Sequence, residues 1–317
     1  MTGGRALALH LGVAAVLGVL QFVLPPFHHG MVTRILFFST YAMAYNLLFG
    51  YAGLLSLGHA MFFAAGMYGA GLPVYYLGMG SGSAFLLGLG SGLLLAAAVG
   101  AASLRASGSA FPVVTMMFGQ VSYLLTLHFN WITFADQGLV LVDRLLPLHL
   151  GPWSVPLTDP AVRYVLAWGL FTVVLWVSLW IVRSPFGRIL VALREHEERA
   201  RMMGYDPFRY RWVAVCLSGG VAGAAGAAYA LSFGYVGNAF ASILYSIYPL
   251  LWVLLGGAGT TLGPLVGVLL MTYAVDVVSG FTSAYLVVVG LALVLVTLGF
   301  PQGILGRVRA RWWRWLP

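Results

Sequence analysis

The sequence predicts an all-α integral membrane protein, a polytopic bundle of about 8–10 transmembrane helices with both termini in the cytoplasm. Of its 317 residues, 61% are hydrophobic and 8% are charged, whereas a soluble domain carries roughly 25% charged residues. So few charged side chains cannot cover a water-facing surface, so lipid must be part of the solvent. The apolar runs are long and continuous, which favours helices over a barrel, because barrel strands alternate in polarity.

Ten apolar runs are candidates for the helices, and a bilayer crossing needs about 20 such residues. The first run resembles a signal peptide, but it is long for one, ends at Pro25 and Pro26 and lacks a small-residue cleavage site. We therefore predict that it is a retained helix. Two half-length re-entrant segments could replace one crossing. The predicted helices cover residues 6–24, 33–49, 60–77, 84–104, 112–129, 161–182, 212–233, 242–255, 265–278 and 284–298.

The arginines give the bundle an orientation. All 16 basic residues are arginine, and with 8 acidic residues they set a net charge of +8. If the helices alternate from an inner N-terminus, thirteen of the 16 arginines fall on one side, and only Arg34, Arg144 and Arg163 fall on the other. The positive-inside rule makes the richer side the cytoplasm. The charge is thus explained by membrane topology, and we expect no nucleic-acid partner.

We expect a single transmembrane domain over residues 1–317, with a periplasmic loop at 130–160 and a cytoplasmic loop at 183–211. The cytoplasmic loop holds seven arginines, which cannot lie in lipid together because each costs about 2.5 kcal/mol or more at the bilayer centre. Opposite charges recur four residues apart between positions 194 and 201, which predicts a short helix over about residues 189–203. Gly204 stands where a helix C-cap glycine is usual.

This loop either is a solvated segment that sets topology or is a docking helix for a cytoplasmic partner. The segment from Glu198 to Gly204 has the form E-x-A-x3-G, which resembles the coupling loop of ABC-importer permeases, and this resemblance favours the docking helix. The candidate coupling residues are Arg194, Glu195, Glu198, Ala200 and Gly204.

A second group of candidates surrounds the glycine-rich stretch at residues 50–58. Glycines permit a broken helix, which is tolerated at membrane depth only beside protein or a water-filled cavity, and its free N–H groups can bind a zwitterionic substrate. Alternatively, the glycines allow close helix packing while polar side chains bond between helices. Two further polar residues lie on the fifth predicted helix, about 140° apart around it, so they need not share a face. The candidate path residues are Asn46, Gly53, Ser56, Gly58, His59, Thr115 and Gln120.

Three further positions allow a structural role or more than one interpretation. Asp276 lies near the outer end of the ninth predicted helix, as an interfacial residue or as a contact for a substrate amine. Gly219 and Gly223 form a GxxxG pair that predicts close helix packing. No metal-ligand spacing, catalytic motif or G-x4-G-K-[ST] phosphate loop is present in the sequence. We therefore predict neither a metal, nor a bound cofactor, nor an enzymatic activity.

Four segments together carry a family resemblance. They read AYNLLFGYAGLLSLGHAMFFAAGMYGA at 44–70, SPFGRILVALREHEERARMMGYDPFRYR at 184–211, LLGGAGTTLGPLVG at 254–267 and FPQGILG at 300–306. They resemble the LivM type of branched-chain amino acid ABC transporter permeases. Two departures stand out. TFADQGL at 133–139 replaces a TGG-S-D-G-like run, and Arg in place of Ala is the second residue of the loop's E-A-A pattern.

The resemblance implies a permease subunit of an ATP-driven importer in a bacterial inner membrane, which translocates branched-chain or other small hydrophobic amino acids. It implies a sister permease in a heterodimer, two cytoplasmic ATPases that use the ATP, and a periplasmic or lipid-anchored binding protein. A urea or short-chain amide importer of the same superfamily is the alternative. An intramembrane enzyme is an alternative of another class, and it would need a polar catalytic cluster that the sequence does not show.

Overall fold

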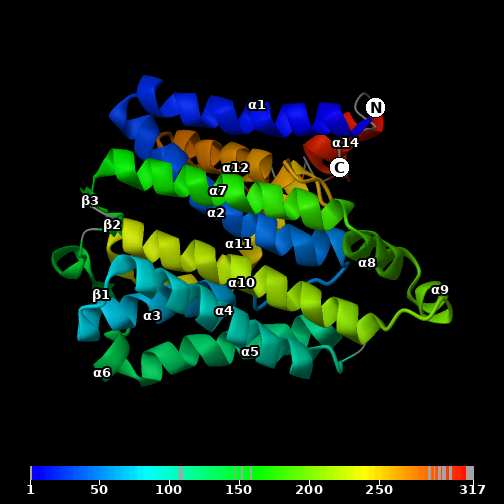
Figure 1. Cartoon of the computed structure of the whole chain (residues 1–317), viewed down its shortest axis with the longest axis horizontal. Helices are drawn as coiled ribbons and strands as arrows, with labels where there is room; N and C mark the ends of the chain where they lie inside the picture. Colours follow the sequence, from blue (N-terminus) through cyan, green and yellow to red (C-terminus); the bar gives the residue numbers. More distant parts are fainter. Residues whose placement is uncertain are drawn as a thin grey trace.

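The computed structural model is a bundle of helices that run mainly along one direction (Figure 1). Six of its helices, α1, α3, α4, α5, α7 and α10, are long and apolar enough to cross a membrane, which confirms the predicted polytopic helical membrane fold, while the cytoplasmic side of the termini stays a prediction. The structure describes residues 2–106, 110–146, 148–150, 153–157, 159–284, 287–288, 290–291, 294, 298–299 and 302–311.

The first nine predicted runs each coincide with a helix, whereas the tenth, 284–298, lies largely outside the described residues. The second helix begins earlier than predicted, because Pro26 occupies its first turn, where proline is favoured. The helices are α1 (Thr2–Val23), α2 (Pro26–Asn46), the π-helix η1 (Leu47–Tyr51), α3 (Ala60–Leu77), α4 (Ser81–Ser103), α5 (Ala110–His128), α6 (Asn130–Thr133), η2 (Val142–Arg144), α7 (Pro160–Arg183), α8 (Pro185–Glu195), α9 (Glu197–Met202), α10 (Pro207–Phe233), η3 (Asn238–Ala241), α11 (Ile243–Gly256), α12 (Gly263–Ser279) and α14 (Gly303–Arg311).

Three helices begin on the same local signal, an oxygen-bearing side chain followed by proline. Asp159 accepts a hydrogen bond from the backbone of α7, Ser184 from that of α8 and Asp206 from that of α10. The capping oxygen satisfies a free N–H group, and the proline that follows has no N–H to satisfy. The signals at Ser184 and Asp206 fix where the chain leaves the bundle for the cytoplasmic loop at 183–211 and where it re-enters the bundle.

The helices α3, α4 and α10 pack with their backbones almost in contact. A Cβ atom on Gly66 of α3 would lie 1.9 Å from the Gly223 carbonyl oxygen of α10, and one on Gly92 of α4 would lie 2.7 Å from the Gly223 Cα. Only glycine permits such an approach, so the GxxxG pair of Gly219 and Gly223 has the packing role that its spacing predicts.

The two ends of the bundle differ in character (Figure 1). One end bears α8, α9, α14 and the start of α1, and we call it the charged end. The opposite end, the loop end, bears α6 and four short strands: β1 (Leu139–Val140), which pairs with β4 (Tyr235–Val236), and β2 (Leu148–Leu150), which pairs with β3 (Trp153–Val155). The predicted cytoplasmic and periplasmic loops therefore lie at opposite ends of the molecule.

The hairpin of α11 and α12 is short. Helix α11 has 14 residues, which is about 21 Å at 1.5 Å per residue and less than the roughly 30 Å of a hydrocarbon core. Its partner α12 packs against it through glycine, because a Cβ on Gly267 would lie 1.8 Å from the Trp252 carbonyl oxygen. The turn between the two helices, residues 257–262, thus lies inside the bundle near the charged end.

The helix expected over residues 189–203 is wrong in one respect, because two helices occupy this region. His196 has an extended backbone (φ −148°) and separates α8 from α9. Only one of the expected four-residue pairs, Glu197–Arg201, is an ion pair in the described chain, at 3.1 Å. The other two would span His196, where the helical spacing is lost. Glu197 also binds Arg211 at 2.8 Å, which joins α9 to α10.

Candidate functional site

The predicted break between the second and third helices is present. Helix α2 ends at Asn46, the chain turns through η1, and residues 52–59 form no helix before α3 begins. Gly53 at φ +71° supplies a left-handed conformation that suits glycine. The amide of Ala60, at the start of α3, donates to Ser246 Oγ of α11 at 2.9 Å. A non-helical backbone therefore lies within the bundle, covered by protein.

Gly58 brings this break against α5. A Cβ on Gly58 would lie 1.8 Å from the Thr115 carbonyl oxygen, and one on Gly119 would lie 2.9 Å from the Gly58 Cα. The Thr115 hydroxyl accepts from the Leu57 amide at 3.2 Å. Gly58 and Thr115 thus meet, and their contacts are those of close packing, while their part in a substrate path stays a prediction.

His59 and Ser56 are buried polar residues without a hydrogen-bond partner in the described chain. His59 is 0% exposed and Ser56 is 1% exposed, and both ring nitrogens of His59 and the Ser56 hydroxyl are unpaired. The His59 ring lies against Tyr41, Tyr45 and Phe62, with ring centroids 5.2–5.5 Å apart. Buried polar groups that lack a protein partner suit a site that contacts a polar ligand.

Asn46 joins the break to the α11–α12 turn. Its Nδ2 donates to the Thr260 carbonyl at 2.9 Å, and its Oδ1 accepts from the Gly259 amide at 3.0 Å. Both ends of the side-chain amide are thereby engaged with backbone groups that no helix satisfies. These bonds match the interhelical alternative for Asn46, while its part in a substrate path stays a prediction.

Two further residues hold the same turn. His10 of α1 lies 2.7 Å from the Thr261 hydroxyl, and Arg309 of α14 donates to the Gly259 carbonyl at 3.1 Å. Helices from both ends of the sequence therefore contact one turn, which residue spacing alone does not reveal.

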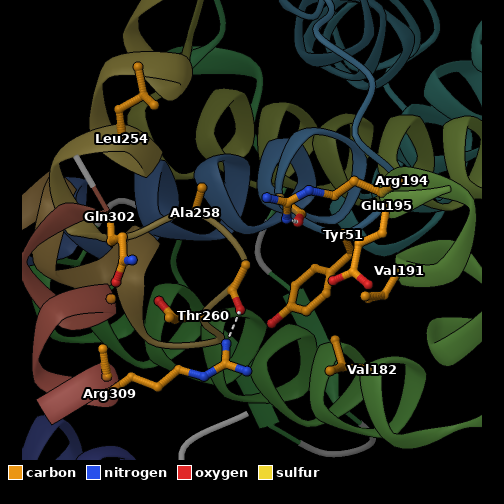
Figure 2. A pocket seen from close by; sticks show the side chains of 14 residues that line it. Tyr51, Val182, Val191, Arg194, Glu195, Leu254, Ala258, Thr260, Gln302 and Arg309 are labelled. Carbon is orange, nitrogen blue, oxygen red and sulfur yellow. Dashed lines mark hydrogen bonds between the residues drawn. The ribbon is translucent and has the colours of Figure 1, made fainter.

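A cavity of about 530 Å³ lies between the helices of the charged end and two non-helical segments, the break after α2 and the α11–α12 turn. We call these segments the two breaks and the cavity the charged-end cavity (Figure 2). Arg194 of α8 reaches across to the break and donates to the Gly50 carbonyl. The Tyr51 hydroxyl points into the cavity, and Glu195 lies beside it. Arg309 enters from the other side, on α14.

The coupling candidates divide into two groups. Arg194 reaches toward the break after α2, and Ala200 lies on the buried side of α9, at 3% exposure. Glu198 is exposed, and Gly204 closes α9 at φ +88°, as its C-cap position predicts. Next to them Met202 is 81% exposed and Met203 is 72% exposed. The tip of α9 is thus an apolar surface suited to a protein partner.

Gln120 does not join the other path candidates. It lies on the exposed face of α5, among Met116, Met117 and Val121, while Thr115 faces the break. The separation around the helix expected from their spacing explains this result. An amide on the outer face of a membrane helix is costly beside lipid.

A second cavity, of about 520 Å³, lies at the loop end, and we call it the loop-end cavity. Arg34 and Arg163 line it, with their guanidinium carbons 5.5 and 5.7 Å from the centroid of the Phe233 ring. Asp276 lines it too, and within the described part of the chain it forms no ion pair with either arginine. The described residues contain no group of three or more His, Cys, Asp or Glu that could hold a metal ion.

Comparison with known proteins decides the family. The family described as "Branched-chain amino acid transport system / permease component" matches residues 29–298. The chain belongs to this family. It is therefore a multi-pass membrane protein and a permease subunit of the ABC importer type, one component among others of a transport system. Its family is one of transporters rather than enzymes.

Similar permeases come from bacteria and archaea. The LivM permease protein of a high-affinity branched-chain amino acid transport system in Salmonella typhimurium is 28% identical over 297 residues, which is 88% of this chain and 70% of the relative. The corresponding Escherichia coli protein is 27% identical over the same shares. A probable LivM permease of Methanocaldococcus jannaschii is 34% identical over 110 residues, 33% of this chain and 32% of the relative. No solved structure matches the permease.

Proposed function

We propose that this permease imports small hydrophobic amino acids, branched-chain ones above all, across a bacterial inner membrane. It works with a sister permease in a heterodimer, two cytoplasmic ATPases and a periplasmic or lipid-anchored binding protein. The ATPases use the ATP, and this chain binds no cofactor and catalyses no reaction. The supporting observation is that an exposed loop, α8–α9, connects directly to a broken helix inside the bundle through Arg194. Such a connection suits a chain whose movement is driven from outside.

The charges of the loop-end cavity favour an amino acid over urea or an amide. Arg34 and Arg163 present two guanidinium groups, which suit a carboxylate, and Asp276 presents a carboxylate, which suits an ammonium group. A zwitterionic amino acid carries both charges, whereas urea carries neither. The names of the relatives point to the same class of substrate.

Reconstitution tests this function. In proteoliposomes that contain the complete complex, we expect ATP-dependent uptake of leucine that valine and isoleucine inhibit and urea does not. The permease purified by itself should hydrolyse no ATP. Cysteines at Glu198 and Gly204 should crosslink to an ATPase, because both positions are accessible on α9. Uptake of urea but not leucine, or crosslinks that never capture an ATPase, would refute the proposal.

We propose that the sister permease binds to the exposed face of α5. Gln120 stands there among apolar residues such as Met117, which is 63% exposed, so a protein partner would spare the amide from lipid. With Cys216 replaced by serine, cysteines at positions 117 and 120 are expected to crosslink to the sister permease. A cysteine at Val173 of α7, 60% exposed, serves as the control. Equal crosslinking from both helices would contradict this placement.

A further inference from the structure

Two broken segments meet at the charged end of the bundle. A Cβ on Gly50 of η1 would lie 2.5 Å from the amide nitrogen of Gly259 in the α11–α12 turn. Asn46 binds both the Gly259 amide and the Thr260 carbonyl. The break after α2 and the turn before α12 are therefore one connected unit, although they are about 200 residues apart in the sequence.

Each broken segment also offers a backbone carbonyl to an arginine from a different helix. Arg194 of α8 donates to the Gly50 carbonyl, and Arg309 of α14 donates to the Gly259 carbonyl at 3.1 Å. A guanidinium group suits this role because it remains charged and bonds strongly to a carbonyl. Both bonds are made to backbone groups, so they track the position of the backbone directly.

The space around these bonds is open. The charged-end cavity of about 530 Å³ separates α8 from α14, and the two arginines extend into it from opposite sides (Figure 2). Gly53, with a Cβ position 2.7 Å from the Arg194 Cγ, leaves room for the stem of that side chain. Continuous packing does not fill the cavity, so the arginines are the links that bridge it.

We propose that Arg194 and Arg309 are positioning residues that transfer movement of the charged-end helices to the two breaks. This makes α14 a second lever beside α8. The inference rests on the proposed function, since it assigns a route by which the ATPases act on the substrate path. Pulling α8 would shift Gly50 through Arg194, and Asn46 would carry the shift to Gly259, whose carbonyl Arg309 holds.

The test compares arginine variants in proteoliposomes that contain the complete complex. For Arg194→Ala and for Arg309→Ala, we expect the number of ATP molecules hydrolysed per leucine imported to rise roughly tenfold, a typical coupling effect. Arg194→Lys keeps a positively charged donor group on a long stem, so it should restore part of the coupling. Arg188→Ala on α8 and Arg311→Ala on α14 are the matched controls, both exposed, and should leave the ratio unchanged.

Two results would overturn the proposal. One is an unchanged ratio in both alanine variants. The other is a loss of uptake that matches a lower amount of assembled complex, with the ratio unchanged and no rescue by lysine, because that would show a structural role alone. Failure of the proposed function would differ from both, since the wild-type complex itself would then show no leucine uptake coupled to ATP hydrolysis.

Discussion

Replacement of Gly58 by leucine is expected to prevent folding of the permease rather than to impair transport selectively. The first side-chain carbon would lie 1.8 Å from the Thr115 carbonyl oxygen and 3.2 Å from the Gly119 amide nitrogen, one turn further along the same face of α5. Because the obstacle is backbone, the helices would have to separate, at a cost of about 3 kcal/mol or more. The yield of monodisperse protein in detergent and its melting temperature provide the measurement.

Gly90→Leu is the matched control, because a Cβ on Gly90 of α4 meets nothing within 4 Å. Normal yield for both variants would contradict the described contact between the break and α5.

The variant His59→Phe distinguishes a packing role of His59 from a role in the substrate path. It keeps an aromatic ring beside Tyr41 and Tyr45 but removes the unpaired nitrogens, so we expect normal folding and uptake lower by up to about tenfold. Unchanged uptake would leave His59 with a packing role.

The double substitution Met202→Glu with Met203→Glu is expected to remove the ATPases from the complex. Both side chains project from the tip of α9, at 81% and 72% exposure, so the fold should tolerate the change. Buried apolar anchors at protein interfaces each contribute about 2 kcal/mol or more, so two acids there should weaken binding by roughly a thousandfold. Copurification of ATPase with tagged permease gives the measurement.

Leu146→Glu is the control for charge alone, because Leu146 is also exposed, at 46%, but lies just before β2 at the loop end. This variant should copurify with ATPase normally. If the α9 variant retained full ATPase binding, the docking surface would lie elsewhere on the charged end.

The fold class follows from the sequence because lipid imposes strong rules. Composition and run length required a helical bundle, and nine of the predicted runs coincide with helices. The glycine-rich stretch at residues 50–58 predicted the break, because a cluster of glycines can be recognised in the sequence itself. The placement of arginines anticipated that the two loops lie at opposite ends.

The long-range links were not predictable in this way. Nothing in local spacing shows that Asn46 reaches Thr260 or that Arg309 reaches Gly259, since those contacts depend on how separate helices pack. Arg194 was predicted for coupling as part of the loop, but its direction into the bundle depends on how α8 packs against the break. The exposed position of Gln120 follows from helical geometry once the packed face of α5 is known.

The glycine contacts among α3, α4 and α10 have a mechanical consequence. Where backbone meets backbone, as at Gly66 and Gly223, no side chain can change rotamer to accommodate sliding. These three helices therefore behave as a stiff block that resists shear. The break after α2 is connected differently, because side-chain hydrogen bonds of Asn46 and Arg194 hold it to the α11–α12 turn and to α8. Movement that these side chains transmit is thus expected at the breaks, with the glycine-packed block as the fixed frame beside them.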